Sequence, residues 1–353
     1  MKRKVNVWAI AAAAAVLTAL LLLTGCPNHA VGGPRQKEAV IVTLKDEDLV
    51  IEGTVLKGYR QVYPLDTNLV LKVPAYITKI ADRAFSSCNN LTSVDLSGCT
   101  ALQTIGEYAF SSCMRLTSVD LSGCTALQTI GKSAFSGYSY LMGGLTSVDL
   151  SGCTRLQTIG AYAFSSCNNL TSVNLSGCTG LKTIGIGAFR NCTKLTSVDL
   201  SGCTKLQTIG KYAFVDSQSL TSINLSGCTD LTTIGESAFY KCTKLTSVNL
   251  TGCTALQTIG EKAFFDCEGL TSVDLRTSVL QTIGSYAFSG CTEAEIWLPA
   301  SVRSIGEHAF GKGTSTHQSY HIFCKKILVP NEQVKGLVAG WPCDYNQYVH
   351  TWH

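Results

Sequence analysis

Residues 91–113 read LTSVDLSGCTALQTIGEYAFSSC, and close variants of this phrase recur along the chain. The copies begin at Leu91, Leu116, Leu145, Leu170, Leu195, Leu220, Leu245 and Leu270. The step between copies is 25 residues, except for one step of 29 where residues 138–143 add length. A fixed period of this size is typical of a solenoid, in which each unit buries its apolar face only against its neighbours. The repeat therefore predicts one elongated body and favours binding over catalysis.

One copy of the phrase can be interpreted as one turn of the solenoid. In Leu91–Leu96 the alternation of Val94, Asp95 and Leu96 predicts a short strand with the apolar side chains inward. Leu102 and Ile105 give a second inward pair. Because stacked strands lie about 4.8 Å apart, ten such turns would extend over roughly 50 Å.

Each turn also contains an Ala-Phe pair, in a corner such as residues 107–113 for which a helical turn is one option. An aromatic at the same place in every turn predicts an internal column. Its members are Phe85, Phe110, Phe135, Phe164, Phe189, Phe214, Phe239, Phe264, Phe288 and Phe310. Glycine follows the isoleucine nine times, from Gly106 to Gly306, which predicts a positive φ or a close backbone approach. Valine should therefore be more costly there than at Gly180.

These repeats resemble the BspA-like leucine-rich repeat family of bacterial surface proteins. The apolar spacing of Leu91–Leu96 is similar to the LxxLxL core of leucine-rich repeats, and the terminal turns, residues 71–80 and 296–306, read like the usual unit of the family. The middle turns replace its Pro step with Ser-Gly-Cys-Thr. The resemblance implies a repeat solenoid of leucine-rich-repeat type with short parallel strands, about ten turns and a cap at both ends. It also implies a closing strand and short helix within residues 327–342.

The beginning of the chain is typical of an export signal. Lys2–Lys4 are basic, and Val7–Leu23 is an apolar run interrupted only by Thr18. The tetrapeptide Leu23–Cys26 resembles the lipobox of bacterial lipoproteins, which implies cleavage after Gly25 and a lipid on the sulfur of Cys26. Lipidation of this kind would anchor the protein to a membrane. An ordinary signal peptide or an uncleaved anchor is the alternative.

We therefore predict five segments: a lipoprotein signal peptide at 1–25, a flexible tether at 26–37, an N-terminal cap at 38–67, the solenoid at 68–313, and a C-terminal cap and tail at 314–353. The whole chain has 28 basic and 24 acidic side chains, and loss of Lys2–Lys4 leaves 25 basic ones. A near-neutral chain of this kind offers no overall electrostatic footprint for nucleic acid, so we predict no nucleic-acid partner.

Most of the 17 cysteines occupy two repeat positions. One set is Cys99, Cys124, Cys153, Cys178, Cys203, Cys228 and Cys253, and the other is Cys88, Cys113, Cys167, Cys192, Cys242, Cys267 and Cys291. Stacking would place each set in a ladder. The spacing of about 4.8 Å suits a disulfide, but parallel Cβ directions fit its dihedral angle poorly. We favour free structural thiols, with disulfides between turns or a metal as alternatives.

Cys324 and Cys343 belong to neither ladder, so a disulfide between them is one option for an exported protein, although it is not the favoured one. They also form a loose set with four histidines that could hold zinc, namely His317, His321, His350 and His353. The alternative is a polar loop followed by a disordered end, and this alternative is favoured.

The outward residues of the first strand form the candidate binding face. One column is Ser93, Ser118, Ser147, Ser172, Ser197, Ser222, Ser247 and Ser272, and beside it run Asp95, Asp120, Asp149, Asn174, Asp199, Asn224, Asn249 and Asp274. Carboxylates about 4.8 Å apart repel each other by roughly 1 kcal/mol in water. The face is interpreted as a contact surface for a basic protein segment or Ca²⁺, or as a solvated face that keeps the protein soluble. The strip lacks aromatic and arginine anchors, which favours weak or multivalent contact.

The eight copies of the phrase contain no histidine, so no Ser-His-Asp or Cys-His arrangement can form within them, and no glycine-rich phosphate loop follows a strand. We predict no enzyme activity and no cofactor. The family resemblance implies an adhesin-like protein that binds host matrix, host cells or other bacteria and is held on the cell envelope by the lipid on Cys26. The alternative function is an envelope scaffold that faces the periplasm.

Overall fold

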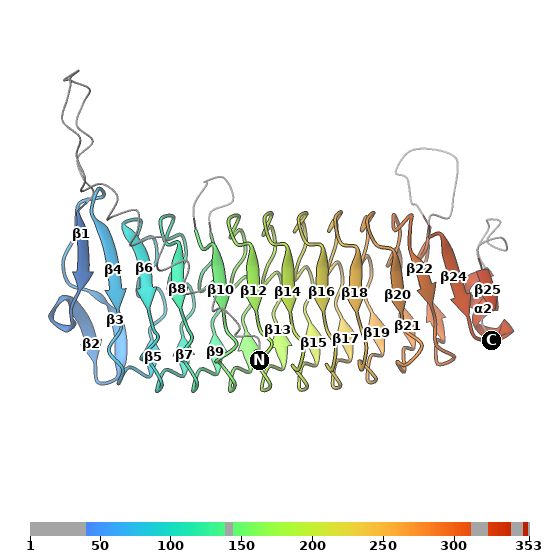
Figure 1. Ribbon diagram of the computed structural model, residues 1–353, viewed down its shortest axis with the longest axis horizontal. Coiled ribbons are helices and arrows are strands. Elements are labelled where there is room, and N and C mark those ends of the chain that lie inside the picture. Colours follow the sequence, from blue (N-terminus) through green and yellow to red (C-terminus); the bar gives the residue numbers. More distant parts are fainter. Residues whose placement is uncertain (1–39, 138–143, 312–323, 340–348, 352–353) are drawn as a thin grey trace, which may run out of the picture. The chain divides into compact units, whose positions relative to one another are not determined.

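The structure is a computed structural model that describes residues 40–137, 144–311, 324–339 and 349–351. Residues Ala39–His353 form one compact unit, in which the turns follow one another in sequence order (Figure 1). No helix in the described ranges is long and apolar enough to cross a membrane. The predicted signal peptide, tether and lipidation site at Cys26 lie outside the described residues, and they remain predictions.

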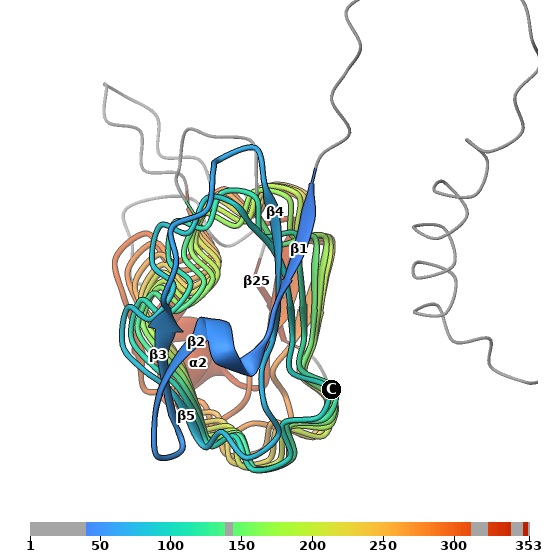
Figure 2. The same ribbon diagram turned by 90° about the vertical axis from the view of Figure 1, so that its left-hand side faces the viewer.

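Each turn contributes strands to two columns, which lie on opposite sides of the unit (Figure 2). The first column pairs in the orders β1-β4-β6-β8 and β10-β12-β14-β16-β18-β20-β22-β24-β25. Its strands are β1 (Ile41–Leu44), β4 (Asn68–Lys72), β6 (Leu91–Asp95), β8 (Ser118–Asp120), β10 (Ser147–Asp149), β12 (Ser172–Asn174), β14 (Ser197–Asp199), β16 (Ser222–Asn224), β18 (Ser247–Asn249), β20 (Ser272–Asp274), β22 (Glu295–Trp297), β24 (Lys326–Val329) and β25 (Val349–Thr351).

The second column is one continuous sheet. Its strands, in order, are β2 (Leu49–Glu52), β3 (Val55–Tyr59), β5 (Lys79–Ile80), β7 (Thr104–Ile105), β9 (Thr129–Ile130), β11 (Thr158–Ile159), β13 (Thr183–Ile184), β15 (Thr208–Ile209), β17 (Thr233–Ile234), β19 (Thr258–Ile259), β21 (Thr282–Ile283) and β23 (Ser304–Ile305). Only β2 and β3 pair antiparallel among the described strands. The ten strands from β5 to β23 mark the ten predicted turns, and the terminal strands extend the stack to about eleven.

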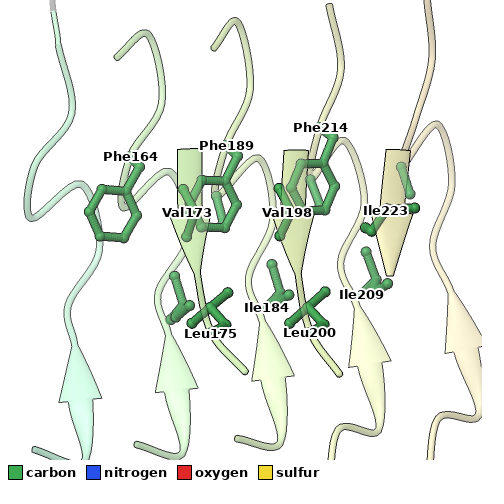
Figure 3. Close-up of a cluster of buried hydrophobic side chains, with 14 of the residues drawn as sticks. Phe164, Val173, Leu175, Ile184, Phe189, Val198, Leu200, Ile209, Phe214 and Ile223 are labelled. Atoms are coloured by element: carbon green, nitrogen blue, oxygen red, sulfur yellow. The ribbon is translucent and has the colours of Figure 1, made fainter. Parts of the chain in front are cut away.

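The strands are short because each turn must redirect the chain, and their register is set by the core. Isoleucine pairs with isoleucine in the second column, as Ile159 does with Ile184, and valine pairs with valine in the first, as Val148 does with Val173. A slip of one residue would expose these apolar side chains. Figure 3 shows the resulting inward rows of valine, leucine, isoleucine and phenylalanine. The prediction of parallel strands in a leucine-rich-repeat solenoid is confirmed.

The ten phenylalanines of the corners form the predicted internal column. Neighbouring ring centroids lie 5.1–5.7 Å apart and the ring planes are within 7° of parallel. At the N-terminal end Tyr59 stacks on Phe85 with 6.1 Å between centroids. Offset stacking of this kind adds to the stabilisation that the rings gain from burial. The column therefore locks each turn to the next.

The corners are not helical turns, so that option was wrong. Tyr108 and Ser112 have φ values of 55° and 60°, in the left-handed region. With this geometry, alternate backbone N–H groups point along the solenoid axis. Tyr108 N–H donates to Lys132 O at 2.8 Å, Phe110 N–H to Ala134 O at 2.7 Å, and Ser112 N–H to Ser136 O at 2.8 Å. The corner is therefore a third line of hydrogen bonds between turns.

The glycine that follows each isoleucine is explained by close backbone approach. A Cβ atom added to Gly131 would lie 2.7 Å from the carbonyl carbon of Gly106 and 2.7 Å from Glu107 N, in the preceding turn. None of these nine glycines has a positive φ, so the other option is excluded. At Gly180 the nearest atom would be Thr154 O at 3.0 Å, which is less severe.

The two ends of the stack are built differently from its middle. At the N-terminal end, β1 pairs with β4, and the 3-10 helix η1 (Asp46–Asp48) connects to the β2–β3 hairpin. At the C-terminal end, β24 is followed by helix α2 (Glu332–Ala339), which agrees with the closing strand and helix that the resemblance implied. The sheet order is interrupted between β8 and β10, beside the insertion at 138–143. There, Thr146 N–H still donates to Thr117 O at 3.1 Å.

Candidate binding surfaces

The predicted strand face is formed as the repeat spacing requires. In the paired strands Ser172 lies opposite Ser197, and Asn174 lies opposite Asp199. The serines and the acidic or amide side chains of this face are half-buried or exposed in all eight turns. The face is therefore a continuous polar surface that follows the first strand column.

The Asp and Asn side chains of this face also have a local structural task, which the sequence analysis missed. Asp95 Oδ1 accepts a hydrogen bond from Ser97 N–H at 3.0 Å, and the same bond recurs in all eight turns. Such side-chain-to-backbone bonds stabilise tight turns. The Asx residues therefore fix the tight turn that follows each strand, which reads Ser-Gly-Cys-Thr in six of the eight turns. The sequence does contain a signal for this task. Aspartate and asparagine both occur at this position of the repeat, and the feature they share is a side-chain oxygen that can accept a hydrogen bond.

Asparagine also reduces the repulsion that the sequence predicts along the column. Asn224 Nδ2 donates to Asp199 Oδ1 at 3.3 Å, and Asn249 Nδ2 donates to Asn224 Oδ1 at 3.1 Å. These bonds join three consecutive turns. Amides at three of the eight positions, Asn174, Asn224 and Asn249, thus interrupt the line of like charges, and two of them bond to the neighbouring turn.

The C-terminal end of the strand face carries the anchor residues that the sequence analysis expected to be absent. Arg276 Nη2 lies 2.7 Å from Asp274 Oδ2, and its guanidinium lies 5.8 Å from the centre of the Trp297 ring. Trp297 lies opposite Asp274 in the pairing of β20 with β22. Hydrogen bonds from the Arg276 side chain hold the pKa of Asp274 below its ordinary value. Arginine and tryptophan are the residue types that most often dominate binding energy in interfaces.

A second surface feature, in which two aromatic rings are half-buried, lies on the corners of the C-terminal half. The residue after the corner phenylalanine is serine in the first four full turns, but it becomes Arg190, Val215, Tyr240 and Phe265 in the next four. Tyr240 and Phe265 stack with 5.2 Å between ring centroids and line a hollow with Arg190 and Glu236. The sequence signal for this patch was the break in an otherwise constant column.

Polar contacts order the edge of this hollow. Glu236 accepts a hydrogen bond from Lys211 Nζ at 2.7 Å and another from Tyr212 Oη at 3.1 Å. The bond from Lys211 lowers the pKa of Glu236 and raises the pKa of Lys211 itself. These side chains are already paired with one another, which leaves the aromatic rings as the main contact groups of the patch.

The cysteine ladders are free thiols that donate hydrogen bonds between turns. All fifteen cysteines in the described ranges are free, and fourteen of them are buried. Cys99 Sγ donates to Val73 O at 3.4 Å in one ladder, and Cys113 Sγ donates to Phe85 O at 3.0 Å in the other. Ser217 takes a cysteine position and donates to Phe189 O at 3.1 Å. The structure thus agrees with structural thiols, which the sequence analysis favoured over disulfides between turns.

Burial keeps these thiols protonated. It raises the pKa to about 11 at Cys99 and to about 12 at Cys153, Cys167, Cys203 and Cys253. A protonated thiol can donate to a carbonyl, whereas a thiolate is the form that reacts or binds a metal. Within the described ranges, no group of three or more His, Cys, Asp and Glu side chains could hold a metal ion.

Cys324 was wrongly separated from the ladders. Its Sγ donates to Phe288 O at 3.6 Å, as Cys291 Sγ does to Phe264 O at 3.1 Å, so it continues the second ladder. The sequence hid this because residues 312–323 are inserted between the corner and the cysteine. Cys343, the proposed disulfide partner, and three of the four histidines of the proposed zinc set, His317, His321 and His353, lie outside the described residues. Cys324 is a free thiol in the described part of the chain, so the disulfide stays an untested option, as does the zinc set, which was the less favoured alternative.

A parallel solenoid with a leucine and isoleucine core and a polar strand face is the architecture of a leucine-rich repeat protein. The matching family model is described as "BspA type Leucine rich repeat region (6 copies)" and covers residues 67–143, 144–257 and 232–326. The chain belongs to this family, as the sequence resemblance indicated.

Several of the solved structures that match this chain are leucine-rich repeat proteins of bacteria. One from Bacteroides ovatus is 23% identical, with 88% of this chain and 96% of that chain covered and a TM-score of 0.30. The T. pallidum protein TpLRR is 18% identical, with 72% and 91% covered and a TM-score of 0.42. A leucine-rich cell surface protein of Faecalibacterium prausnitzii is 19% identical, with 76% and 91% covered and a TM-score of 0.30. Among curated proteins, none matches this chain.

Proposed function

We propose that the protein is a lipid-anchored, adhesin-like binding protein displayed on the bacterial cell envelope, and that its strand face contacts proteins of the host matrix, of host cells or of other bacteria. The observation that carries this proposal is the strand face itself. It is a continuous polar surface that runs across successive turns and carries the Arg276 and Trp297 anchors at its C-terminal end. Solenoids use extended surfaces of this kind to bind other macromolecules.

A binding role is favoured over catalysis because the chemistry of the face is repetitive. The outward residues are serine, aspartate and asparagine. The side-chain oxygens of the aspartates and asparagines already accept a hydrogen bond from the backbone N–H two residues later in the chain. The eight copies of the repeat phrase, which carry these serines, contain no histidine that could act as a base beside them. We therefore expect many weak contacts along the face, strengthened at the Arg276 and Trp297 end.

Binding can be tested with the fragment 39–353, which forms one compact unit. The double variant Arg276→Ser and Trp297→Asn places the residues of the equivalent positions in other turns into the anchor site. If the fragment binds a panel of immobilised extracellular matrix proteins, the variant should bind about tenfold more weakly, because it loses both anchor side chains.

A second variant separates charge from anchoring. This variant carries Asp95→Asn, Asp120→Asn and Asp149→Asn. It removes three charges but keeps the side-chain oxygen that accepts a hydrogen bond from the backbone N–H two residues later. A loss of binding here, with the anchor variant unaffected, would assign contact to the acidic half of the face. Undiminished binding by both variants would contradict the strand face as the contact surface.

The membrane anchor is tested separately. Mass spectrometry of the protein purified from membranes should show a lipid on Cys26, and an unmodified thiol at that position would contradict the proposed anchor. Protease treatment of intact cells should remove the solenoid if it faces outward. Survival of the solenoid would favour the alternative, an envelope scaffold that faces the periplasm.

A further inference from the structure

A basic hollow lies on a different surface from the strand face, in the segment between the first and second strand columns. In the cysteine ladder that begins at Cys99, the residue two places after the cysteine is alanine in three turns, at Ala101, Ala126 and Ala255. In three consecutive turns it is instead Arg155, Gly180 and Lys205. Lys182 also replaces the glutamine that stands at Gln157 and Gln207. Four departures from the repeat therefore fall on one small area.

Gly180 opens this area because it has no side chain between those of Arg155 and Lys205. The hollow is lined by Gln128, Thr154, Arg155, Gln157, Thr179, Gly180, Lys182, Thr204 and Lys205. The three basic side chains are exposed, and within the described ranges none has a carboxylate within ion-pair distance. The next carboxylate along the column is Asp230, one turn beyond Lys205.

The arrangement suits a linear polyanion better than a single small anion. Turns repeat about every 4.8 Å, so cations on three turns span roughly 10 Å along the solenoid axis. The hollow is open, so it cannot strip water from one ion, but it can exchange counterions along a charged chain. Threonine hydroxyls and glutamine amides in the lining could bond to sugar hydroxyls. The lining contains no aromatic side chain on which a nucleotide base could stack.

We propose that the hollow around Gly180 binds a sulfated polysaccharide, with Arg155, Lys182 and Lys205 each facing a sulfate group. This inference goes beyond the proposed function, because it concerns another surface and another class of ligand. Its test requires neither the lipid anchor nor a protein partner, so the two proposals can fail independently.

The probe is immobilised heparan sulfate, and the protein is the fragment 39–353. The triple variant Arg155→Ala, Lys182→Gln and Lys205→Ala installs residues that other turns already carry at these positions, so the fold is preserved. Its affinity at low salt should fall at least about tenfold, and the slope of log Kd against log salt should decrease by about 2 because about three counterion contacts are lost.

The matched control removes the same number of charges elsewhere. Lys79→Thr, Lys194→Asn and Lys244→Ser likewise install residues of neighbouring turns. This variant should bind heparan sulfate within about twofold of the parent, since its cations lie outside the hollow. Equal losses in both variants would overturn the proposal, because they would show an effect of net charge alone.

Two further polyanions complete the test. Unsulfated hyaluronan should bind more weakly than heparan sulfate, because it lacks sulfate groups, and equal binding would overturn the proposal. DNA of similar length should also bind more weakly. Equal or tighter binding of DNA would assign the hollow to nucleic acid and would likewise overturn the proposal, as would no binding of heparan sulfate at 50 mM salt.

Discussion

At the scale of single residues, the repeat positions differ in what they demand. The corner phenylalanine, the strand valine and the isoleucine before glycine could be assigned to the core from their spacing alone. The exchange of aspartate for asparagine along the column of Asp95 indicates a shared role of the side-chain oxygen, but the partner of its turn-capping bond could not be assigned, because that bond depends on the backbone path of the next two residues. Arg276 and Trp297 could not be placed together either. They lie 21 positions apart, outside the constant phrase, and only the register of β20 on β22 makes them neighbours.

The glycines that follow isoleucine give a direct test of backbone contact between turns. Gly131→Ala should lower the free energy of unfolding by about 3 kcal/mol, because the new Cβ would overlap backbone atoms that cannot rotate away. Gly180→Ala is the matched control. Other turns carry alanine there, so it should change stability by less than about 1 kcal/mol. Urea unfolding of both variants measures the difference, and equal midpoints would contradict the packing of glycine on glycine.

At the scale of elements, the strands were predictable and the corners were not. The strands follow from period-two alternation and from side chains that pair with copies of themselves. The corners depend on left-handed residues such as Tyr108, Ser133 and Lys241, none of which requires a positive φ by its own chemistry. That conformation is imposed by hydrogen bonds to the following turn, which the sequence of one repeat does not reveal.

Ser112 tests this account of the corner. It has a φ of 60°, and the equivalent position near the C-terminal end is Gly290, with a φ of 85°. Ser112→Val should destabilise the fold by about 1–2 kcal/mol, because a β-branched residue is strained in the left-handed region. Ser112→Gly should be neutral or stabilising by up to about 1 kcal/mol.

The neighbouring residue supplies the control for this experiment. Ser111 does not have a positive φ, and valine occurs naturally at its equivalent position, Val215. Ser111→Val should therefore be tolerated better than Ser112→Val in thermal unfolding. The corner geometry would be refuted if valine were accepted equally at both positions.

At the scale of the whole molecule, identical inward rows make the stability of the solenoid a sum over turns. The contribution of one buried side chain to stability is therefore repeated in each turn that carries the same residue. The fourteen buried thiols are the clearest case, because each loses its ordinary acidity on folding. The effect of thiol ionisation on the free energy of unfolding is small for one cysteine, but it is multiplied by the number of buried cysteines.

Alkaline pH should therefore destabilise the protein steeply. The thiols ionise near pH 9 when unfolded, but burial raises the pKa to about 11 at Cys99 and about 12 at Cys153, Cys203 and Cys253. Between these limits the folded state holds protons that the unfolded state releases, so stability falls as pH rises. The contribution is fully present below pH 9, and each thiol removes up to about 1.4 kcal/mol per pH unit above it.

The dependence can be measured as the urea midpoint between pH 7.5 and 10.5, with a reductant present throughout to prevent oxidation of unfolded chains. A variant with Cys153→Ser, Cys203→Ser and Cys253→Ser retains donors in the ladder, as Ser217 does in the other ladder, but it does not titrate in this range. Its stability should fall less steeply, by up to about 4 kcal/mol per pH unit less than the parent. An unchanged slope would mean that these three thiols are not protonated, buried donors in the folded protein, because only such groups couple folding to proton release above pH 9.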